Sequence, residues 1–258
     1  MPREPRPLDL LGWYIEAGAD EAIGETPVNR FAQAAPKPDA SISHAPAPRR
    51  AVKAVPPAAE NAREIAASCA TIDDLVAAIG AFEGCVLKET ATNTVVYDGN
   101  PKAPILFVGE APGAEEDRRG LPFVGPAGRL LDRMLAAIGL DRGTACIANV
   151  IFWRPPGNRP PTADELATCL PFAQRLIELV APKVVVFVGG IPAKSLLERS
   201  EGITRLRGTW HDYHSPGLAQ PIAAIATFHS AFLLRQPIRK RESWRDLLAI
   251  KARLAGLS

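Results

Sequence analysis

The sequence predicts an α/β fold with three layers, αβα, around a central four-stranded, mainly parallel sheet. Short apolar runs alternate with helical patterns along the chain, which is the element order of doubly wound parallel sheets. One run, Lys183–Val188, is a continuous β-branched stretch of the kind that a parallel sheet buries on both faces. A hydrophobic fraction of 47% in 258 residues is enough for the core of one such domain and an appendage.

Three segments are expected along the chain: residues 1–30, 31–60 and 61–258. The first carries an acidic amphipathic helix, Leu8–Ile23, which could pack on the domain or bind a protein partner. The second is rich in alanine and proline, a composition that buries little surface and blocks helices, so we expect a linker. The third is the globular domain.

The globular domain is expected to begin with a helix over Ile65–Phe82, in which Thr71 could act as a cap. The predicted strands are Pro104–Val108, Thr144–Ile151, Lys183–Val188 and Ile222–Phe228. The later predicted helices are Ala127–Ile138, Thr162–Val180, Ile191–Glu198 and Arg239–Leu254. Thr162 and Glu165 form a Thr-x-x-Glu pattern, which predicts a capping box at the start of its helix.

Charge and targeting patterns narrow the function classes. The net charge is only +2, but acids crowd the loop after Gly109 while bases cluster near the end of the sequence, a segregation compatible with nucleic-acid binding. The basic cluster comprises Arg235, Arg239, Lys240, Arg241 and Arg245. Because no apolar run approaches a membrane span and no signal-peptide core is present, we expect a cytoplasmic protein without membrane contact.

The most informative stretch is Gly109–Leu135, GEAPGAEEDRRGLPFVGPAGRLLDRML. It leaves a predicted buried strand and leads into a helix, so its turns and acids lie where strand ends and helix N-termini converge on ligands. A loop built only for turning would not need Glu110 and Glu116 close to Phe123. This stretch therefore predicts a binding site at one edge of the sheet.

Two polar residues are expected at the same edge. Asn149 closes the second strand, where its amide could both donate to and accept from a base, or merely cap a turn. His229 follows the fourth strand, where it could donate a hydrogen bond to a developing anion, or cap the next helix.

Two loops could contact DNA. After His229 we expect a loop whose apolar residues stand beside Arg235; we call Phe232–Arg235 the wedge segment. Apolar side chains next to arginine are what proteins insert into a minor groove to displace a base, although these leucines could also fill the core. Arg154 and Arg159 lie in a Pro/Gly loop and could contact phosphates or simply be solvated.

Taken together, these segments resemble the family 4 uracil-DNA glycosylases, and in particular a bacterial branch of them. The resemblance covers Cys85 to Leu254 and rests on the order and spacing of GEAPG (Gly109–Gly113), LPFVGPAG (Leu121–Gly128), Asn149, RPPGNR (Arg154–Arg159) and HSAFLLRQP (His229–Pro237). It implies the uracil-DNA glycosylase-like fold and a monofunctional enzyme of base excision repair. Such an enzyme flips uracil out of DNA and hydrolyses its N-glycosidic bond, which releases free uracil and leaves an abasic site in the DNA.

The resemblance also implies residue roles. Glu110 would orient or activate water and stabilise the sugar cation, and His229 would stabilise charge on uracil O2. Phe123 would stack on the flipped base, Asn149 would read its edge, and Glu116 would obstruct the methyl group of thymine. The other implied substrate contacts are Gly109, Ala111 and Gly113. Leu233 and Leu234 would fill the hole left in the duplex, and the remaining implied DNA contacts are Arg154, Asn158, Arg159, Ser230 and Arg235.

Two departures from the family pattern stand out. Most members have His-Pro in the last motif, whereas Ser230 stands here in place of proline; we expect a phosphate contact from Ser230 and retained activity. Family members also usually hold a [4Fe–4S] cluster with four cysteines. Only Cys85 and Cys169 match ligand positions, while Phe82 and Trp153 occupy the other two.

Two thiolates cannot hold a cubane that needs four. The remaining cysteines, Cys69 and Cys146, fall in a predicted helix and a predicted strand and are expected to be packing residues. We therefore expect no iron–sulfur cluster and no other cofactor, with Phe82 and Trp153 packing where the cluster would lie.

Other functions remain open from the sequence. A binder that forms a covalent adduct through a loop histidine is disfavoured because Arg154–Arg159 contains none. A non-catalytic or tightly product-bound module for uracil or abasic DNA is disfavoured by the joint presence of Glu110, Asn149 and His229. A small-molecule hydrolase is allowed by the fold class, but it would have no duplex for the wedge segment to invade.

Overall fold

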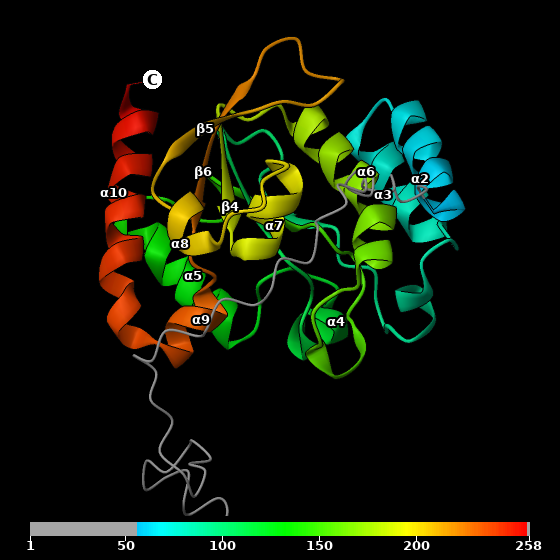
Figure 1. Ribbon diagram of the computed structural model, residues 1–258, viewed down its shortest axis with the longest axis horizontal. Helices are drawn as coiled ribbons and strands as arrows, with labels where there is room; N and C mark the ends of the chain where they lie inside the picture. Colours follow the sequence, from blue (N-terminus) through cyan, green and yellow to red (C-terminus); the bar gives the residue numbers. More distant parts are fainter. Residues whose placement is uncertain (1–55, 257–258) are drawn as a thin grey trace, which may run out of the picture. The chain divides into compact units, whose positions relative to one another are not determined.

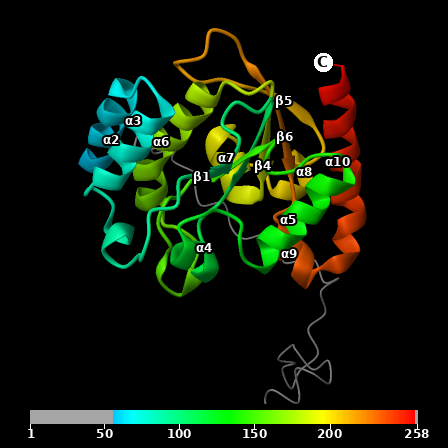
Figure 2. The same cartoon turned by 180° about the vertical axis from the view of Figure 1, so that it is seen from behind.

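The computed structural model describes residues 56–256. The expected helix over Leu8–Ile23 and most of the expected linker lie outside the described residues, so their proposed part in binding a protein partner stays a prediction. Within the described range, helices cover both faces of one sheet, as Figures 1 and 2 show from opposite sides. No helix in this range is long and apolar enough to cross a membrane.

The sheet has six strands in the order β1-β3-β2-β4-β6-β5. Its parallel centre consists of the four predicted strands: β2 (Ile105–Gly109), β3 (Cys146–Asn149), β4 (Val184–Val188) and β6 (Ile222–Thr227). Two antiparallel strands, β1 (Tyr97–Gly99) and β5 (Trp210–Tyr213), close its edges. The three-layer class is confirmed, but the count of four strands is wrong because these half-exposed edge strands carry no apolar run.

The parallel strands bring their carboxyl ends to one edge of the sheet. Gly109 of β2 is in register with Asn149 of β3, and Val188 of β4 is in register with Thr227 of β6. The helices that follow β2 and β6, α4 (Ala114–Arg119) and α9 (Ser230–Arg235), both lie at this end of the sheet in Figure 1. The segments that follow β2, β3 and β6 therefore meet, as expected.

Alternate residues of the central strands face two separate cores. One face carries Ile105, Phe107 and Val186 and packs against α5 (Pro126–Ala137) and α10 (Lys240–Ala255). The opposite face is covered by α2 (Pro57–Ser68), α3 (Ile72–Ala81), α6 (Ala163–Val180) and α7 (Gly190–Leu196). The remaining helical segments are α8 (Ile203–Leu206), η1 (Val86–Glu89), η2 (Pro156–Asn158) and η3 (Pro237–Arg239).

The helix expected over Ile65–Phe82 is two helices. α2 begins at Pro57, inside the expected linker, and ends at Ser68. A capping box then starts α3: the Thr71 hydroxyl accepts the Asp74 N–H at 3.1 Å, and the Asp74 carboxylate accepts the Thr71 N–H at 2.9 Å. The predicted capping box of Thr162 and Glu165 is confirmed at the start of α6.

Candidate active site

A cavity of about 540 Å³ opens at the carboxyl edge of the sheet. It is lined from all three motif segments, by Glu110, Ala111, Gly113, Glu116 and Phe123, by Asn149, Asn158 and Arg159, and by His229 and Arg235. The structure thus brings together most of the residues singled out from the sequence. Phe232, which the sequence assigns to the wedge, also lines this cavity, together with Ala127 and Pro155, which lie within the quoted motifs but were given no role of their own.

Glu110 is held at the end of β2 by its backbone. Its carbonyl oxygen accepts the Ile151 N–H at 3.0 Å, and the carbonyl oxygen of Gly109 accepts the Val150 N–H at 3.0 Å. The side chain is half-buried, and burial raises the pKa of its carboxyl group above the ordinary value of 4.5. A carboxylate that is only partly hydrated can interact strongly with a nearby cation or water.

His229 caps α9 with its own ring. Its Nδ1 accepts the N–H of Ala231 at 3.1 Å. Burial, with a smaller effect of the Arg235 charge, lowers the pKa of His229 from 6.5 to about 4, and Glu116 opposes that shift. The imidazole is therefore neutral at pH 7, and because Nδ1 accepts, Nε2 carries the proton and is a hydrogen-bond donor.

Asn149 and Phe123 share the space above Gly109. Asn149 is 2% exposed, and its Oδ1 has no hydrogen-bond partner among the described residues. A Cβ at Gly109 would lie 2.5 Å from both Asn149 Oδ1 and Phe123 Cζ, so glycine is required for the amide and the ring to approach. A buried, unpaired acceptor is costly, and a ligand N–H donor would satisfy it.

Phe123 has an unusual backbone for an aromatic residue. Its φ is +54°, in the left-handed region that non-glycine residues seldom adopt. Its ring stacks on that of His229, with centroids 5.5 Å apart and planes 29° from parallel. The next turn requires Gly128, because a Cβ there would meet the Phe123 carbonyl oxygen at 1.6 Å. The ring is therefore placed in the cavity by a tightly constrained loop.

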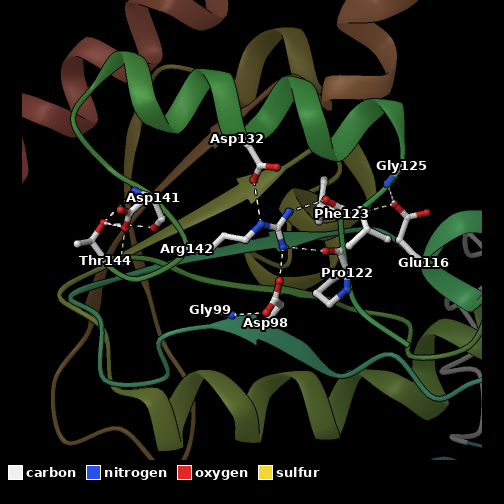
Figure 3. Close-up of polar contacts among 11 residues, drawn as sticks. Asp98, Gly99, Glu116, Pro122, Phe123, Gly125, Asp132, Asp141, Arg142 and Thr144 are labelled. Carbon is white, nitrogen blue, oxygen red and sulfur yellow. Dashed lines mark hydrogen bonds and ion pairs between the residues drawn. The ribbon is translucent and has the colours of Figure 1, made fainter. Parts of the chain in front are cut away.

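Glu116 links the GEAPG and LPFVGPAG segments through hydrogen bonds. Its carboxylate accepts the N–H groups of Val124 at 2.9 Å, Gly125 at 2.8 Å and Gly113 at 3.1 Å. Figure 3 shows the contact with Gly125. Both carboxylate oxygens are thereby held in fixed positions at the cavity wall.

Two arginines of the loop after β3 form hydrogen bonds to neighbouring side chains. Arg154 Nε donates to Asn158 Oδ1 at 2.7 Å. Arg159 donates to both oxygens of Glu165, at 2.8 and 2.6 Å, and these bonds, together with backbone contacts, hold the pKa of that nearly buried carboxyl near 2. The sequence did not predict these pairings; the DNA contacts expected of Arg154, Asn158 and Arg159 stay predictions.

The wedge segment is a helix, α9, and not the expected loop. Its periodicity turns Leu233 inward, where it is 0% exposed and packs with Leu130 and Phe228, so this structure does not present Leu233 to a duplex. Ser230 is also fully buried, so this structure does not present its hydroxyl group to a phosphate. Leu234 is 40% exposed and remains available.

The cysteines do not fit a four-thiolate cluster. Cys85 and Cys169 lie with their sulfurs 4.0 Å apart, both buried. Cys69 instead donates to the Ile65 carbonyl oxygen at 3.2 Å, and Cys146 is buried within β3. In the described part of the chain, no three histidine, cysteine or acidic side chains gather closely enough to hold a metal ion.

Aromatic side chains stand at the two positions where the resemblance would place the other cysteines. Phe82 packs edge-to-face on Phe172, with centroids 5.1 Å apart. Trp153 is 1% exposed, and its Nε1 donates to the Thr94 hydroxyl at 3.0 Å. The residues present therefore make a packed aromatic core.

Comparisons with known proteins agree with this site. The family model described as Uracil DNA glycosylase superfamily matches residues 96–248, which include all three segments that line the cavity. The chain is 39% identical to the type-4 uracil-DNA glycosylase of Archaeoglobus fulgidus over 184 residues, 70% of this chain and 92% of that protein. It is 41% identical to that of Sulfurisphaera tokodaii over 172 residues, 65% and 77% of the two chains. It is also 41% identical to that of Thermotoga maritima over 152 residues, 58% and 77%.

Proposed function

The chain belongs to the uracil DNA glycosylase superfamily, and from that premise we propose that it is a monofunctional uracil-DNA glycosylase. It binds uracil-containing DNA, hydrolyses the N-glycosidic bond of a flipped uracil and leaves an abasic site. The observation that carries this is the convergence of Glu110, Asn149 and His229 on one cavity beside Phe123. No lysine is among the described residues that line the cavity, so no Schiff base and no strand cleavage are expected.

Bond cleavage leaves negative charge on uracil and positive charge on the sugar. His229 stabilises the first, because its neutral ring presents Nε2–H to uracil O2 while Nδ1 is held by Ala231. A fixed donor aimed at developing charge lowers the barrier without reorganisation during the reaction. Glu110 stabilises the positive charge on the sugar with its carboxylate and orients the attacking water. It can also accept a proton from that water, because its pKa is raised.

Recognition of uracil uses the remaining cavity walls. Asn149 Oδ1, which has no partner among the described residues, accepts the N3–H of uracil, whereas cytosine lacks a hydrogen at that position. Phe123 stacks on the base. Glu116, fixed by three backbone N–H groups, obstructs the methyl group of thymine.

Entry of the base into the cavity requires the duplex to open. Leu234 is the exposed apolar residue of the wedge segment, and the neighbouring Arg235 lines the cavity mouth. We assign to Leu234 the filling of the space that uracil leaves, and to Arg235 a phosphate contact. Leu233 has no part in this.

The protein works without an iron–sulfur cluster in this proposal. Its support is the side-chain set: two adjacent thiols, with Phe82 and Trp153 packed in the family's other ligand positions. No step of the reaction is assigned to a metal.

The test uses an end-labelled oligonucleotide with one uracil, treated with protein and then with alkali. We expect alkali-dependent cleavage at uracil by the wild type, and losses of about 10²- to 10³-fold in Glu110→Gln and His229→Gln. Glu115→Gln is the matched control, since this exposed acid of the neighbouring helix α4 pairs with Arg118 and should retain activity. Uracil-dependent binding without cleavage by the wild type would favour a binding module, and neither binding nor cleavage would contradict the proposal.

A further inference from the structure

We propose that Arg142 is a positioning residue for uracil excision, and that it acts through the backbone of Phe123. The inference rests on the proposed function, because it concerns the ring on which uracil stacks. Arg142 lies in the connection between α5 and β3 and is not among the residues that line the cavity. No sequence pattern singled it out.

The guanidinium of Arg142 is the centre of a network of four acceptors (Figure 3). Two of its nitrogens donate to the loop that carries the aromatic ring: Nη2 to the Phe123 carbonyl oxygen at 2.5 Å, and Nη1 to the Pro122 carbonyl oxygen at 3.2 Å. Nη1 also donates to Asp98 of β1, and Nε donates to Asp132 of α5 at 2.9 Å. One side chain therefore ties the loop to an edge strand and to a helix.

The Phe123 carbonyl needs such a contact. Its residue holds a positive φ, which costs free energy that surrounding contacts must offset. Gly128 leaves room for this carbonyl group, but glycine has no side chain that could donate a hydrogen bond to it. Arg142 supplies a charged donor to it, and charge-assisted hydrogen bonds are stronger than neutral ones.

The same loop is held from its other end by Glu116, which binds the N–H groups of Val124 and Gly125. Residues 122–125 are thus fixed by a cation on their carbonyl groups and by an anion on their N–H groups. The Phe123 ring projects from the middle of this stretch toward His229. Loss of the cation would free the preceding carbonyl groups and with them the plane of the ring.

The geometry requires arginine in particular. The Arg142 side chain is 26% exposed, and its planar guanidinium group donates to two carboxylates and two carbonyl groups at once. Lysine would keep the charge that balances Asp98 and Asp132, but its compact ammonium cannot span all four acceptors. Arg142→Lys therefore tests the positioning without leaving two carboxylates unpaired.

A matched control exists on the other face of the sheet. Arg175 of α6 is 23% exposed, donates twice to the Cys69 carbonyl oxygen, at 3.1 and 2.8 Å, and pairs with Glu178. It has the same chemistry as Arg142 but is not among the residues that line the cavity. Arg175→Lys should reproduce any general loss of stability while retaining activity.

The experiment is a double-mutant cycle on kcat/KM for uracil excision, with Phe123→Leu as the second change. We expect Arg142→Lys alone to lower kcat/KM about tenfold or more, since small misplacements of positioned groups are costly. In the Phe123→Leu background the same change should cost less than about twofold, because the two residues act together. Equal losses in both backgrounds, or an equal loss in Arg175→Lys, would overturn the inference.

A second readout does not depend on activity. With 4-fluorophenylalanine in place of Phe123, ¹⁹F NMR should show one narrow resonance that Arg142→Lys shifts or broadens and Arg175→Lys leaves unchanged. An unchanged resonance in Arg142→Lys overturns the positioning claim. If the wild type excises no uracil, the proposed function fails, and the resonance still decides whether Arg142 orders the loop.

Discussion

Two regions of this molecule, one that keeps the family pattern and one that departs from it, are built in opposite ways. At the carboxyl edge of the sheet, polar groups are kept in costly states: Asn149 Oδ1 lacks a partner among the described residues, and burial holds His229 neutral and raises the pKa of Glu110. Around Cys85 and Cys169 on the α6 face, aromatic rings pack closely and the buried indole N–H is hydrogen-bonded.

The difference indicates that the groups that touch the substrate and the core that supports the fold can vary separately. Groups that touch the substrate must be held ready in one arrangement, since a small misplacement costs much activity. A cluster that only joins segments of chain can be replaced by side chains that fill the same role. In the cluster-free protein that we propose, Phe82 would do this by ring packing and Trp153 by packing and one hydrogen bond.

The largest expected effect concerns the pH dependence of the catalytic edge. In the proposed mechanism Glu110 acts as a carboxylate, so its protonation should remove that role, and kcat/KM, which reports the free enzyme, should fall about tenfold per pH unit below its pKa. Burial raises that pKa above its ordinary value, while His229, with a pKa of about 4, stays neutral until the pH falls to about that value. Measured pH profiles should therefore lose this fall in Glu110→Gln. If activity still falls at low pH in that variant, another group is responsible for the fall, and His229 is the first candidate.

A smaller effect separates packing from DNA contact within one helix. Leu233→Ala should lower the free energy of unfolding by about 2–5 kcal/mol, because it leaves a cavity beside Leu130 and Phe228. Leu234→Ala should change stability by less than about 0.5 kcal/mol. It should nevertheless slow excision from duplex DNA about tenfold, and from single strands less, because only the duplex must be opened. Denaturant titration measures the change in stability, and excision rates on duplex and single-stranded DNA measure the role of Leu234. Equal losses of rate on the two substrates would contradict insertion of Leu234 into the duplex.

Features that depend on periodicity and on strand ends are predictable from the sequence. The four parallel strands, the capping box at Thr162 and the convergence of Glu110, Asn149 and His229 at one edge all arise from local patterns. Edge strands β1 and β5 were beyond prediction because they are short and half-exposed.

Other features depend on tertiary contacts alone. Leu233 and Leu234 are identical side chains in adjacent positions, and only the docking of α9 decides that one is buried and one exposed. Arg142 meets Asp98, 44 residues away along the chain, and no local signal marks that contact. The pairing of Arg159 with Glu165 likewise results from the path of the loop.

The smallest expected effect lies in the aromatic core. Replacing both Cys85 and Cys169 with alanine should lower the free energy of unfolding by about 1–2 kcal/mol, as for other small core truncations. Excision of uracil should be unchanged, because neither side chain is among the residues that line the cavity. Loss of folding or activity in this variant would indicate that the two sulfurs do more than pack.

The most direct test of the separation between chemistry and scaffold measures iron, acid-labile sulfide and uracil excision on the same freshly purified fraction. We predict full excision activity with essentially no iron or sulfide, in the wild type and in the double cysteine variant alike. About four irons per chain, present in proportion to activity and lost from the double variant, would contradict the account.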